Sequence, residues 1–379
     1  MRSSRSSTRS ARGPSRTGPD PHRRQVLASL AGLGAATALA PWGTVARAGE
    51  RRQDELLPRH VGPDVVAAVG AGLEWLGGVQ APDGGYTTTT DGATYPVAMT
   101  GLAGMALLAS GSTPSRGPWA DRITRAMRFL ARCSTQNGLI TAPNQDSGRP
   151  MHGHGFALLF LSTLYGMEND PDVRAELATV IAKAVRLTDR GQSRLGGWTY
   201  WPGGGDEGSV TVTQMQGLRA AHAAGFVVPE DTVADAVTYL ERCKTSDGGI
   251  RYSYQSGDST QLPITAAAVA TLYNAGQYDS ELAESCMQYV FERMHDMKAL
   301  NVSGAGGHVY YTHLYASQAF YQAGEDYWGN YFPRASRLLL NEQNEDGSWT
   351  GDGIGEVYGT AIALIILQMP FKLLPIYQR

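Results

Sequence analysis

The sequence predicts an all-α protein built as an α/α toroid, in which six helical hairpins form an α6/α6 barrel behind an N-terminal signal segment. Three observations predict this fold. Six strongly apolar segments each follow a glycine-rich turn, amphipathic segments lie between them, and the last apolar segment, 360–367, is as apolar as the central ones. An open solenoid of the same hairpins is the alternative, but its last helix would need a polar outer face. We therefore expect a closed ring.

Residues 1–48 have the features of an export signal. Residues 1–22 are rich in Ser, Arg and Pro, Arg23-Arg24 lead into an apolar run at 26–40, and Ala46-Arg47-Ala48 fits a cleavage site. Paired arginines are typical of a twin-arginine signal, with a general secretory signal or an uncleaved anchor as alternatives. The apolar run is shorter than the roughly 20 residues that cross a membrane. We expect a bacterial protein outside the cytoplasm, periplasmic or secreted, with no transmembrane span in its mature chain.

The charge balance argues against nucleic acid as a partner. The chain has 32 basic and 35 acidic side chains, and removal of residues 1–48 would leave 24 basic and 34 acidic ones, a net charge of about −10. Nucleic acids and anionic membranes favour basic surfaces. The three cysteines, Cys133, Cys243 and Cys286, are an odd number. Two of them occupy the same place in two repeats, so we interpret them as core thiols.

The predicted toroid spans residues 65–369, after a linker at 49–64 and before a C-terminal tail at 370–379 that lies over one rim. Its inner helices are apolar around most of their circumference, which indicates burial on both sides. Five of them end at a glycine suited to a left-handed C-cap, at 111, 166, 225, 276 and 324. The inner helices are predicted at 96–110, 151–165, 209–224, 262–275, 310–323 and 358–369.

The outer helices carry apolar residues at helical spacing, as in Ile123, Met127 and Leu130, with charge on the opposite face. They are predicted at 65–76, 120–131, 177–187, 233–240, 282–294 and 334–340. Most outer helices are joined to their inner helix by a turn with Gly after a small polar residue, as in Asp83-Gly84-Gly85 or Asp346-Gly347-Ser348. Such a pair favours a backbone with positive φ.

The sixth turn carries a resemblance to known families. Gln343-Asn344-Glu345-Asp346-Gly347-Ser348-Trp349 resembles the QW repeat of squalene–hopene-type terpene cyclases, and the Asp-Gly-Gly turns resemble repeats of protein prenyltransferase β subunits. The resemblance covers roughly residues 65–369 and implies one prenyltransferase-like toroid, isoprenoid chemistry, and a Gln and a Trp that tie the helix end to the turn.

The catalytic signatures of those families are absent from this sequence. There is no Asp-x-Asp-Asp acid and no Asp-Asp-x-x-Asp diphosphate-binding run, and the inner-helix starts at 310–313 and 358–360 lack the cysteine of the prenyltransferase zinc site. The resemblance therefore leaves the reaction open. Two histidine pairs with Asp206 or Asp258 have the side chains of a zinc site, but their spacing is not a known metal motif. We predict neither a metal nor a cofactor.

The inner-helix starts are the best candidates for chemistry. In a closed ring these N-termini face one mouth, where their partial positive charges gather. Histidine is suited to acid–base catalysis near neutral pH, with an acidic loop residue as its partner. We expect His154 to face the ring axis and His152 to stay on the rim; the alternative is that His154 and His313 hydrogen-bond a neighbouring turn. The candidate catalytic residues are His152, His154, Asp206, Glu207, His308 and His313.

Aromatic residues at the same helix starts and in nearby loops are predicted to bind a ligand. The segment 198–207 is dense in Trp, Tyr and Gly, which suits a stacking platform or lid for a sugar or an isoprenoid, or an insertion packed over the rim. Aromatic walls also suit a carbocation. The candidate ligand-binding residues are Trp201, Tyr254, Asp258, Tyr310, Tyr311 and Tyr358.

Three functions remain open at this point. The first is a terpenoid-cyclase-like or prenyltransferase-like enzyme of unknown substrate, which the resemblance implies. The second is a non-catalytic toroid that binds a peptide, glycan or lipid outside the cytoplasm. The third is a polysaccharide-cleaving α/α barrel, in which the histidines and acidic loop residues would be the acid–base groups.

Overall fold

The computed structural model describes residues 57–90, 93–142, 146 and 148–377. The predicted signal segment 1–48, residues 49–56 of the predicted linker and the last two residues of the predicted tail lie outside the described residues.

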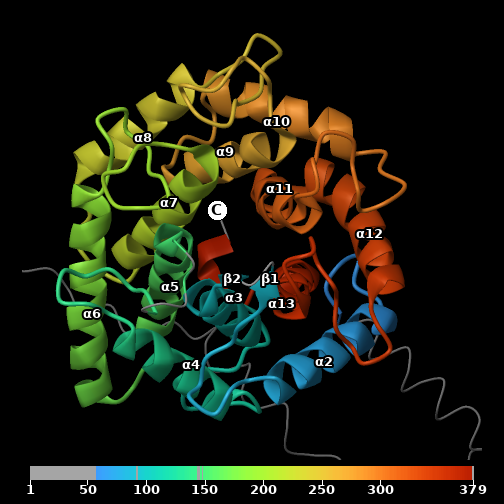
Figure 1. Ribbon diagram of the computed structural model, residues 1–379. Coiled ribbons are helices and arrows are strands. Elements are labelled where there is room, and N and C mark those ends of the chain that lie inside the picture. Colours follow the sequence, from blue (N-terminus) through green and yellow to red (C-terminus); the bar gives the residue numbers. More distant parts are fainter. Residues whose placement is uncertain (1–56, 91–92, 143–145, 147, 378–379) are drawn as a thin grey trace, which may run out of the picture. The chain divides into compact units, whose positions relative to one another are not determined.

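Within residues 57–377 the helices form two concentric layers around one axis (Figure 1). The inner layer consists of α3 (Pro96–Ala109), α5 (Pro150–Tyr165), α7 (Gly208–Ala223), α9 (Leu262–Asn274), α11 (Val309–Ala323) and α13 (Glu356–Gln368). The outer layer consists of α2 (Pro63–Gly78), α4 (Ala120–Arg132), α6 (Pro171–Arg190), α8 (Glu230–Arg242), α10 (Glu281–Met294) and α12 (Glu325–Glu342). The predicted all-α toroid of six hairpins is confirmed.

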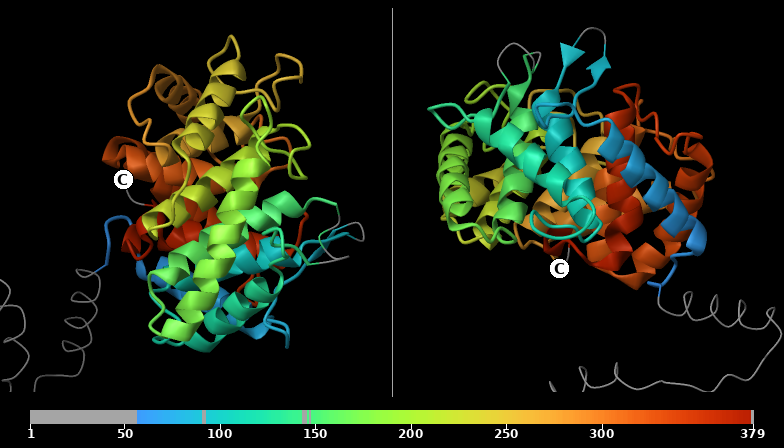
Figure 2. Two further views of the ribbon diagram at one scale, coloured as in Figure 1. Left: turned by 90° about the vertical axis from the view of Figure 1, so that its left-hand side faces the viewer. Right: turned by 90° about the horizontal axis from the view of Figure 1, so that it is seen from below.

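Two short strands, β1 (Thr89–Thr90) and β2 (Ala93–Thr94), pair antiparallel in the loop before α3. Past α13, the chain forms two 3₁₀ turns, η2 (Met369–Phe371) and η3 (Pro375–Tyr377). Leu374, Ile376 and Tyr377 are buried there, so this segment closes the C-terminal end of the inner ring. The hairpin and the C-terminal end lie at opposite ends of the ring axis (Figure 2).

The inner helices agree with the sequence prediction to within two residues at each end, whereas three outer helices, α6, α8 and α12, begin three or more residues earlier than predicted. α12 begins at Glu325, nine residues before the predicted start, and contains Pro333 in its interior. Proline removes one helical hydrogen bond but does not always end a helix. Tyr331 and Phe332 are fully buried just before it, and this packing holds the first half of α12 in place.

Four of the five predicted C-cap glycines have the expected left-handed backbone, and Gly166 does not. Gly166 has a helical φ of −69°, and the helix ends there without a left-handed residue. Cys133 and Cys243 are the C-caps of α4 and α8, the same place in two repeats. All three cysteines are free thiols.

One hydrogen bond recurs between five of the six turns and the inner helix that follows each of them. A turn N–H donates to a side chain in the first half of the helix, from Tyr86 to Thr100 at 2.8 Å and from Trp349 to Thr360 at 2.9 Å. The same bond joins Trp198 to Thr211 and Ile250 to Thr265. In α5 the acceptor is His154 Nδ1, which takes the N–H of Ile140 at 3.1 Å.

The outer layer is joined by the turns, each of which packs on the next outer helix. Gln343 Nε2 donates to its own turn at Gly347 O, 3.0 Å, and to Ala68 O of α2, 2.9 Å. Gly347 has φ of 91°, and an added Cβ would lie 2.7 Å from Ala71 O of the same helix. The sixth hairpin is thereby bonded to the first. The predicted role of this Gln in tying helix end to turn is confirmed, and it also closes the ring.

Candidate active site

The axis-facing residues follow from the recurring bond between turn and helix. The side chain that accepts this bond points outward, toward the outer layer. Successive residues of an α-helix are rotated by about 100°. The residue two positions before this acceptor, and those two, five and nine positions after it, therefore point inward to the ring axis. In α11 the outward residue is His313, which contacts Tyr331 of α12. The first layer of axis-facing residues, at the N-terminal end, is Ala98, His152, Ser209, Pro263, Tyr311 and Tyr358. We call this end the mouth.

The third layer closes the ring interior below the mouth. Gln216 of α7 and Gln318 of α11, the inner helices on either side of α9, form a hydrogen bond of 2.5 Å between Nε2 and Oε1 in the ring interior. Both are buried, as are Met105, Leu159 and Ile365 of the same layer. The polar groups at the mouth are therefore separated from the C-terminal end of the ring.

Glu207 is the N-cap of α7 and supplies the most shielded carboxyl group at the mouth, with 2% of the residue exposed. Its Oε1 accepts from Val210 N–H at 2.6 Å and its Oε2 from Ser209 N–H at 3.0 Å. Burial raises the pKa of Glu207, although its bonds to Ser209 and Val210 act in the opposite direction. The carboxyl group therefore keeps a proton to higher pH than an exposed glutamate.

His152 is connected to this carboxyl group through one hydroxyl. Ser209 Oγ lies 2.6 Å from Glu207 Oε2 and 3.4 Å from His152 Nε2. Burial, with a smaller contribution from Arg149, lowers the pKa of His152 to about 4, so the imidazole is neutral at pH 7. The contact of 3.4 Å is long for a hydrogen bond. The three side chains form a connected series from the buried carboxyl group to the axis.

A second carboxyl group lies at the start of α11. Asp352, from the loop before α13, accepts from the N–H groups of Tyr310 and Tyr311 at 2.9 and 3.2 Å and from Tyr358 Oη at 3.3 Å. Burial raises the pKa of Asp352. The Tyr311 hydroxyl donates to Ser209 O at 3.2 Å, so this tyrosine connects the Asp352 cap to the helix that Glu207 caps.

The loops that precede α7 and α9 present aromatic rings to solvent. Trp201 is 55% exposed, and Tyr252 and Tyr254 are also exposed. The hydroxyls of Tyr200 and Tyr252 lie 2.6 Å apart, and the Arg149 guanidinium lies 4.7 Å above the Tyr200 ring. These two loops place aromatic rings and hydroxyl groups on the surface next to Glu207 and His152.

The histidines do not converge on the mouth as expected. His154 is fully buried and faces outward, where its Nε2 lies 3.0 Å from Thr188 Oγ1 of α6. His313 is likewise buried against Tyr331 Oη and Leu300 O, at 2.8 and 2.9 Å. The expected orientation is reversed, since His152 faces the axis and His154 does not. Both buried rings match the alternative of hydrogen bonds to neighbouring turns and helices, and His308 is an exposed N-cap of α11.

The remaining predicted residues are divided between the mouth and its surroundings. Tyr311 and Tyr358 belong to the axis-facing layer. Tyr310 is buried beside them and contributes its backbone N–H to Asp352. Asp206 accepts from the Tyr254 N–H at 3.1 Å and holds the two aromatic loops together, while Asp258 forms an ion pair with Arg251 at 3.0 Å.

Ser209 and Asp352 are site residues that the sequence did not indicate. Ser209 directly follows Glu207-Gly208 at the start of a predicted inner helix, so its position was readable but its serine had no recognisable motif. Asp352 lies 42 positions after Tyr310 and meets it because the fifth and sixth hairpins pack side by side. No sequence signal pointed to that contact.

Within the described part of the chain, His, Cys, Asp and Glu side chains form no group of three that could hold a metal ion. None of the helices described is both long and apolar enough to cross a lipid bilayer.

No protein-family model matches this chain, and no curated protein matches it. Several solved structures match this chain in fold. The type II terpene cyclase MstE from Scytonema, in complex with geranylgeranyl dihydroxybenzoate, matches with a TM-score of 0.55 and 14% identity over 82% of this chain and 98% of that one. An α-1,6-mannanase from Salegentibacter matches with a TM-score of 0.58 and 10% identity over 81% and 99%. A protein from Actinoplanes matches with a TM-score of 0.56 and 16% identity over 82% and 99%.

These similarities establish the fold of the chain as an α/α toroid shared by a terpene cyclase and a glycan-cleaving enzyme. At such low identities they do not carry the activity of either protein to this one. The choice between these reactions therefore depends on the residues at the mouth.

Proposed function

We propose that the protein is an acid–base enzyme whose proton donor is Glu207, and that its substrate is a glycan bound across the mouth. The observation that carries the proposal is the connected series Glu207, Ser209 and His152, in which a carboxyl group of raised pKa is joined through a hydroxyl to an axis-facing imidazole. General acids work best when their pKa is tuned towards the working pH, and burial is a common way of raising it.

Cleavage of a glycosidic bond needs an acid and a second carboxylate. Protonated Glu207 would supply a proton, through Ser209 and His152, to the glycosidic oxygen, which departs with the leaving sugar. Asp352, on the far side of Tyr311, would accept a proton from the water that adds to the anomeric carbon. The two acids then exchange protons with solvent and the site is restored.

The surroundings favour a hydroxylated substrate. Trp201, Tyr252 and Tyr254 offer exposed rings on which a sugar face can pack, next to the paired hydroxyls of Tyr200 and Tyr252. The bond between Gln216 and Gln318 closes the interior with polar groups below the mouth. A mannanase of this fold is inactive when two consecutive aspartates are replaced, and Asp206-Glu207 are consecutive acids here.

The test is release of reducing ends from a panel of oligosaccharides, with α-1,6-linked mannan oligosaccharides among them. We expect turnover of one linkage class and a loss of about 100-fold or more in kcat for Glu207→Gln. Glu356→Gln, which changes an exposed carboxylate in the first turn of another inner helix, is the matched control and should retain activity. Turnover that survives Glu207→Gln would overturn the assignment of the acid.

Isoprenoid cyclisation is the second candidate, favoured by the tyrosines of the ring interior. Tyr311, Tyr315 and Tyr358 face the axis, and the rings of Tyr311 and Tyr315 pack edge to face with centroids 4.7 Å apart. Electron-rich rings stabilise carbocations, and Glu207 could protonate an alkene. Incubation with a geranylgeranyl-bearing substrate and product analysis by mass spectrometry separates the candidates. A cyclic isomer of unchanged mass, absent with Glu207→Gln, would favour cyclisation over glycan cleavage.

An extracytoplasmic location is part of the proposal. It rests on the arginine pair and apolar run in residues 1–48 and fits an enzyme that meets glycans outside the cell. Fractionation of the producing bacterium should find the protein outside the cytoplasm, and Arg23→Lys with Arg24→Lys should retain it inside.

A further inference from the structure

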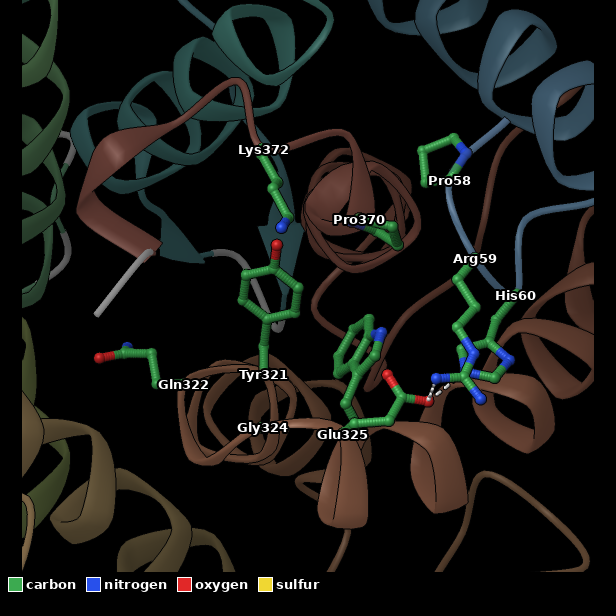
Figure 3. Close-up of a pocket in the computed structure, with 10 residues that line it drawn as sticks. Pro58, Arg59, His60, Tyr321, Gln322, Gly324, Glu325, Pro370 and Lys372 are labelled. Atoms are coloured by element: carbon green, nitrogen blue, oxygen red, sulfur yellow. Dashed lines mark hydrogen bonds and ion pairs between the residues drawn. The ribbon is translucent and has the colours of Figure 1, made fainter. Parts of the chain in front are cut away.

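A pocket lies at the C-terminal ends of α11 and α13, at the end of the ring opposite the mouth, and Figure 3 shows residues that line it. Its volume is about 530 Å³, within the range of small-molecule sites. Four segments far apart in the sequence form its walls: residues 58–60 before α2, the end of α11, the start of α12, and η2 with the residue that follows it. None of these residues takes part in the proposed acid–base chemistry.

The charged groups around this pocket leave it with an excess of positive charge. On one side, Arg59 Nη1 and His60 Nε2 both bind Glu325 Oε1, at 3.1 and 2.7 Å, so the carboxylate is already compensated. On the other side, the Lys372 side chain extends toward the hydroxyl end of Tyr321 (Figure 3). With Arg59, Lys372 and Glu325 charged, the pocket carries a net charge of +1 before any contribution from His60.

Between the two charged sides the pocket has an apolar surface. The indole of Trp328, itself almost fully buried, lines the pocket and contacts the Tyr321 ring edge to face, with ring centroids 4.9 Å apart. Pro58 and Pro370 face it from the residues before α2 and from η2. A ligand that fills this space contacts rings and proline carbons and has cationic groups at its edges.

The backbone of the pocket wall is also unusual. Among the described residues, the non-glycine residues with positive φ are His60, at 69°, and Lys372, at 59°, and both line this pocket. Such conformations are uncommon outside glycine and cluster where a structure holds a side chain for binding. Here the left-handed backbone places an imidazole and an ammonium group on opposite sides of one pocket.

We propose that this pocket binds an organic anion with an apolar or aromatic body, whose acidic head lies within reach of Arg59 and Lys372. The head is a carboxylate, sulfonate or phosphate ester, because guanidinium and ammonium groups bind such oxygens with charge-assisted hydrogen bonds. The body packs on Trp328 and Tyr321. The site shares no residue with the mouth, so a negative result here leaves the proposed function unaffected.

The experiment uses the full chain and the aromatic sulfonate 1-anilinonaphthalene-8-sulfonate, followed by its fluorescence. We expect saturable binding at one site, weakened about tenfold by Lys372→Gln and by Arg59→Gln and further by both together. Lys298→Gln, an exposed lysine on the loop between α10 and α11, is the control and should leave the affinity unchanged. The uncharged probe N-phenyl-1-naphthylamine should bind at least tenfold more weakly than the sulfonate.

A further variant separates lost charge from lost folding. Lys372→Gly removes the ammonium group and relieves the left-handed backbone, so the thermal midpoint should stay or rise while affinity falls. Equal binding by the double variant, equal binding of the uncharged probe, or full competition by equimolar inorganic sulfate would each overturn the proposal.

Discussion

The side-chain amide of Gln343 donates a hydrogen bond to the backbone carbonyl of Ala68, 275 positions earlier in the chain. The contact joins the last turn of the ring to the first outer helix. Gln80 makes the equivalent bond to Arg122 O, and Gln192 to Thr232 O, so a glutamine at the end of one outer helix binds the next. Three of the six junctions therefore use the same device.

Gln343→Ala should destabilise the protein by roughly 2–3 kcal/mol. The substitution leaves Ala68 O and Gly347 O without their partner at a mostly buried junction, and each unsatisfied acceptor costs about 1 kcal/mol or more. Denaturant unfolding measures the change. Gln288→Ala, an exposed glutamine on α10, should change the free energy of unfolding by less than about 0.5 kcal/mol. Equal effects of the two substitutions would contradict the role of this junction.

His154→Thr should preserve the fold and the activity better than His154→Ala. Threonine is the acceptor at the matching place in four other inner helices, and its hydroxyl can take the N–H of Ile140. Alanine leaves that N–H buried and unpaired, at a cost of about 1–3 kcal/mol beyond the lost packing. Thermal unfolding and activity of both variants measure this. A catalytic His154 would instead show as loss of turnover in a stably folded His154→Thr protein.

The buried imidazoles should make stability depend on pH between about 4 and 6.5. Burial lowers the pKa of His154 and of His313 to about 4, below the ordinary value of 6.5. In that window the unfolded chain binds more protons than the folded one, so stability is complete above pH 6.5 and falls as the pH is lowered. Each ring contributes roughly 2–3 kcal/mol over the window.

Glu207 and Asp352 act in the opposite direction, because burial raises their pKa values. Their contribution is present at low pH and declines as the pH rises past the range of an ordinary carboxyl group. The wild type and His154→Thr share these two carboxyl groups, so their contributions cancel in the difference between the two free energies of unfolding. We expect that difference, measured by denaturant unfolding at pH 4.5 and pH 7.5, to shrink at the lower pH; a constant difference would argue against a neutral buried His154.

Ser209→Ala should lower kcat about 10- to 100-fold, since the hydroxyl is the connection between Glu207 and His152. Stability should change by no more than about 1 kcal/mol, because Glu207 still caps α7 through the N–H groups of residues 209 and 210. Ser209→Thr keeps a hydroxyl at the same place and should restore most of the rate. Unchanged kcat in Ser209→Ala would remove the serine from the mechanism and leave Glu207 to act directly.

The ring could be predicted from the sequence because every hairpin repeats the same local signals. Apolar circumference, helical spacing and Gly-containing turns are all properties of short segments, and they placed the inner helices to within two residues. The exceptions have local causes too. The outer helix predicted to begin at 334 begins at Glu325, because the buried side chains of Tyr331 and Phe332 hold α12 together through Pro333.

The mouth was predicted less well because its geometry depends on rotation about each helix axis and on contacts between distant loops. A shift of two residues turns a side chain by about 200°, which is why His152 faces the axis and His154 does not. The threonines at matching places in the other repeats held the relevant clue, since they mark the outward face. Asp352 is beyond such reasoning, because it belongs to the loop before α13 and reaches α11 only when the fifth and sixth hairpins pack side by side.

The contact of the sixth turn with α2 also has a consequence for how the protein comes apart. A solenoid can lose its terminal repeats one at a time, since each end has a neighbour on one side only. Here Gln343 and Gly347 hold the first outer helix, and Gln368 of α13 bonds Ala106 of α3 at 3.0 Å. Neither terminal hairpin can fray without breaking the other's contacts. We expect the helices of the first hairpin to exchange their amide hydrogens as slowly as those of the middle of the ring.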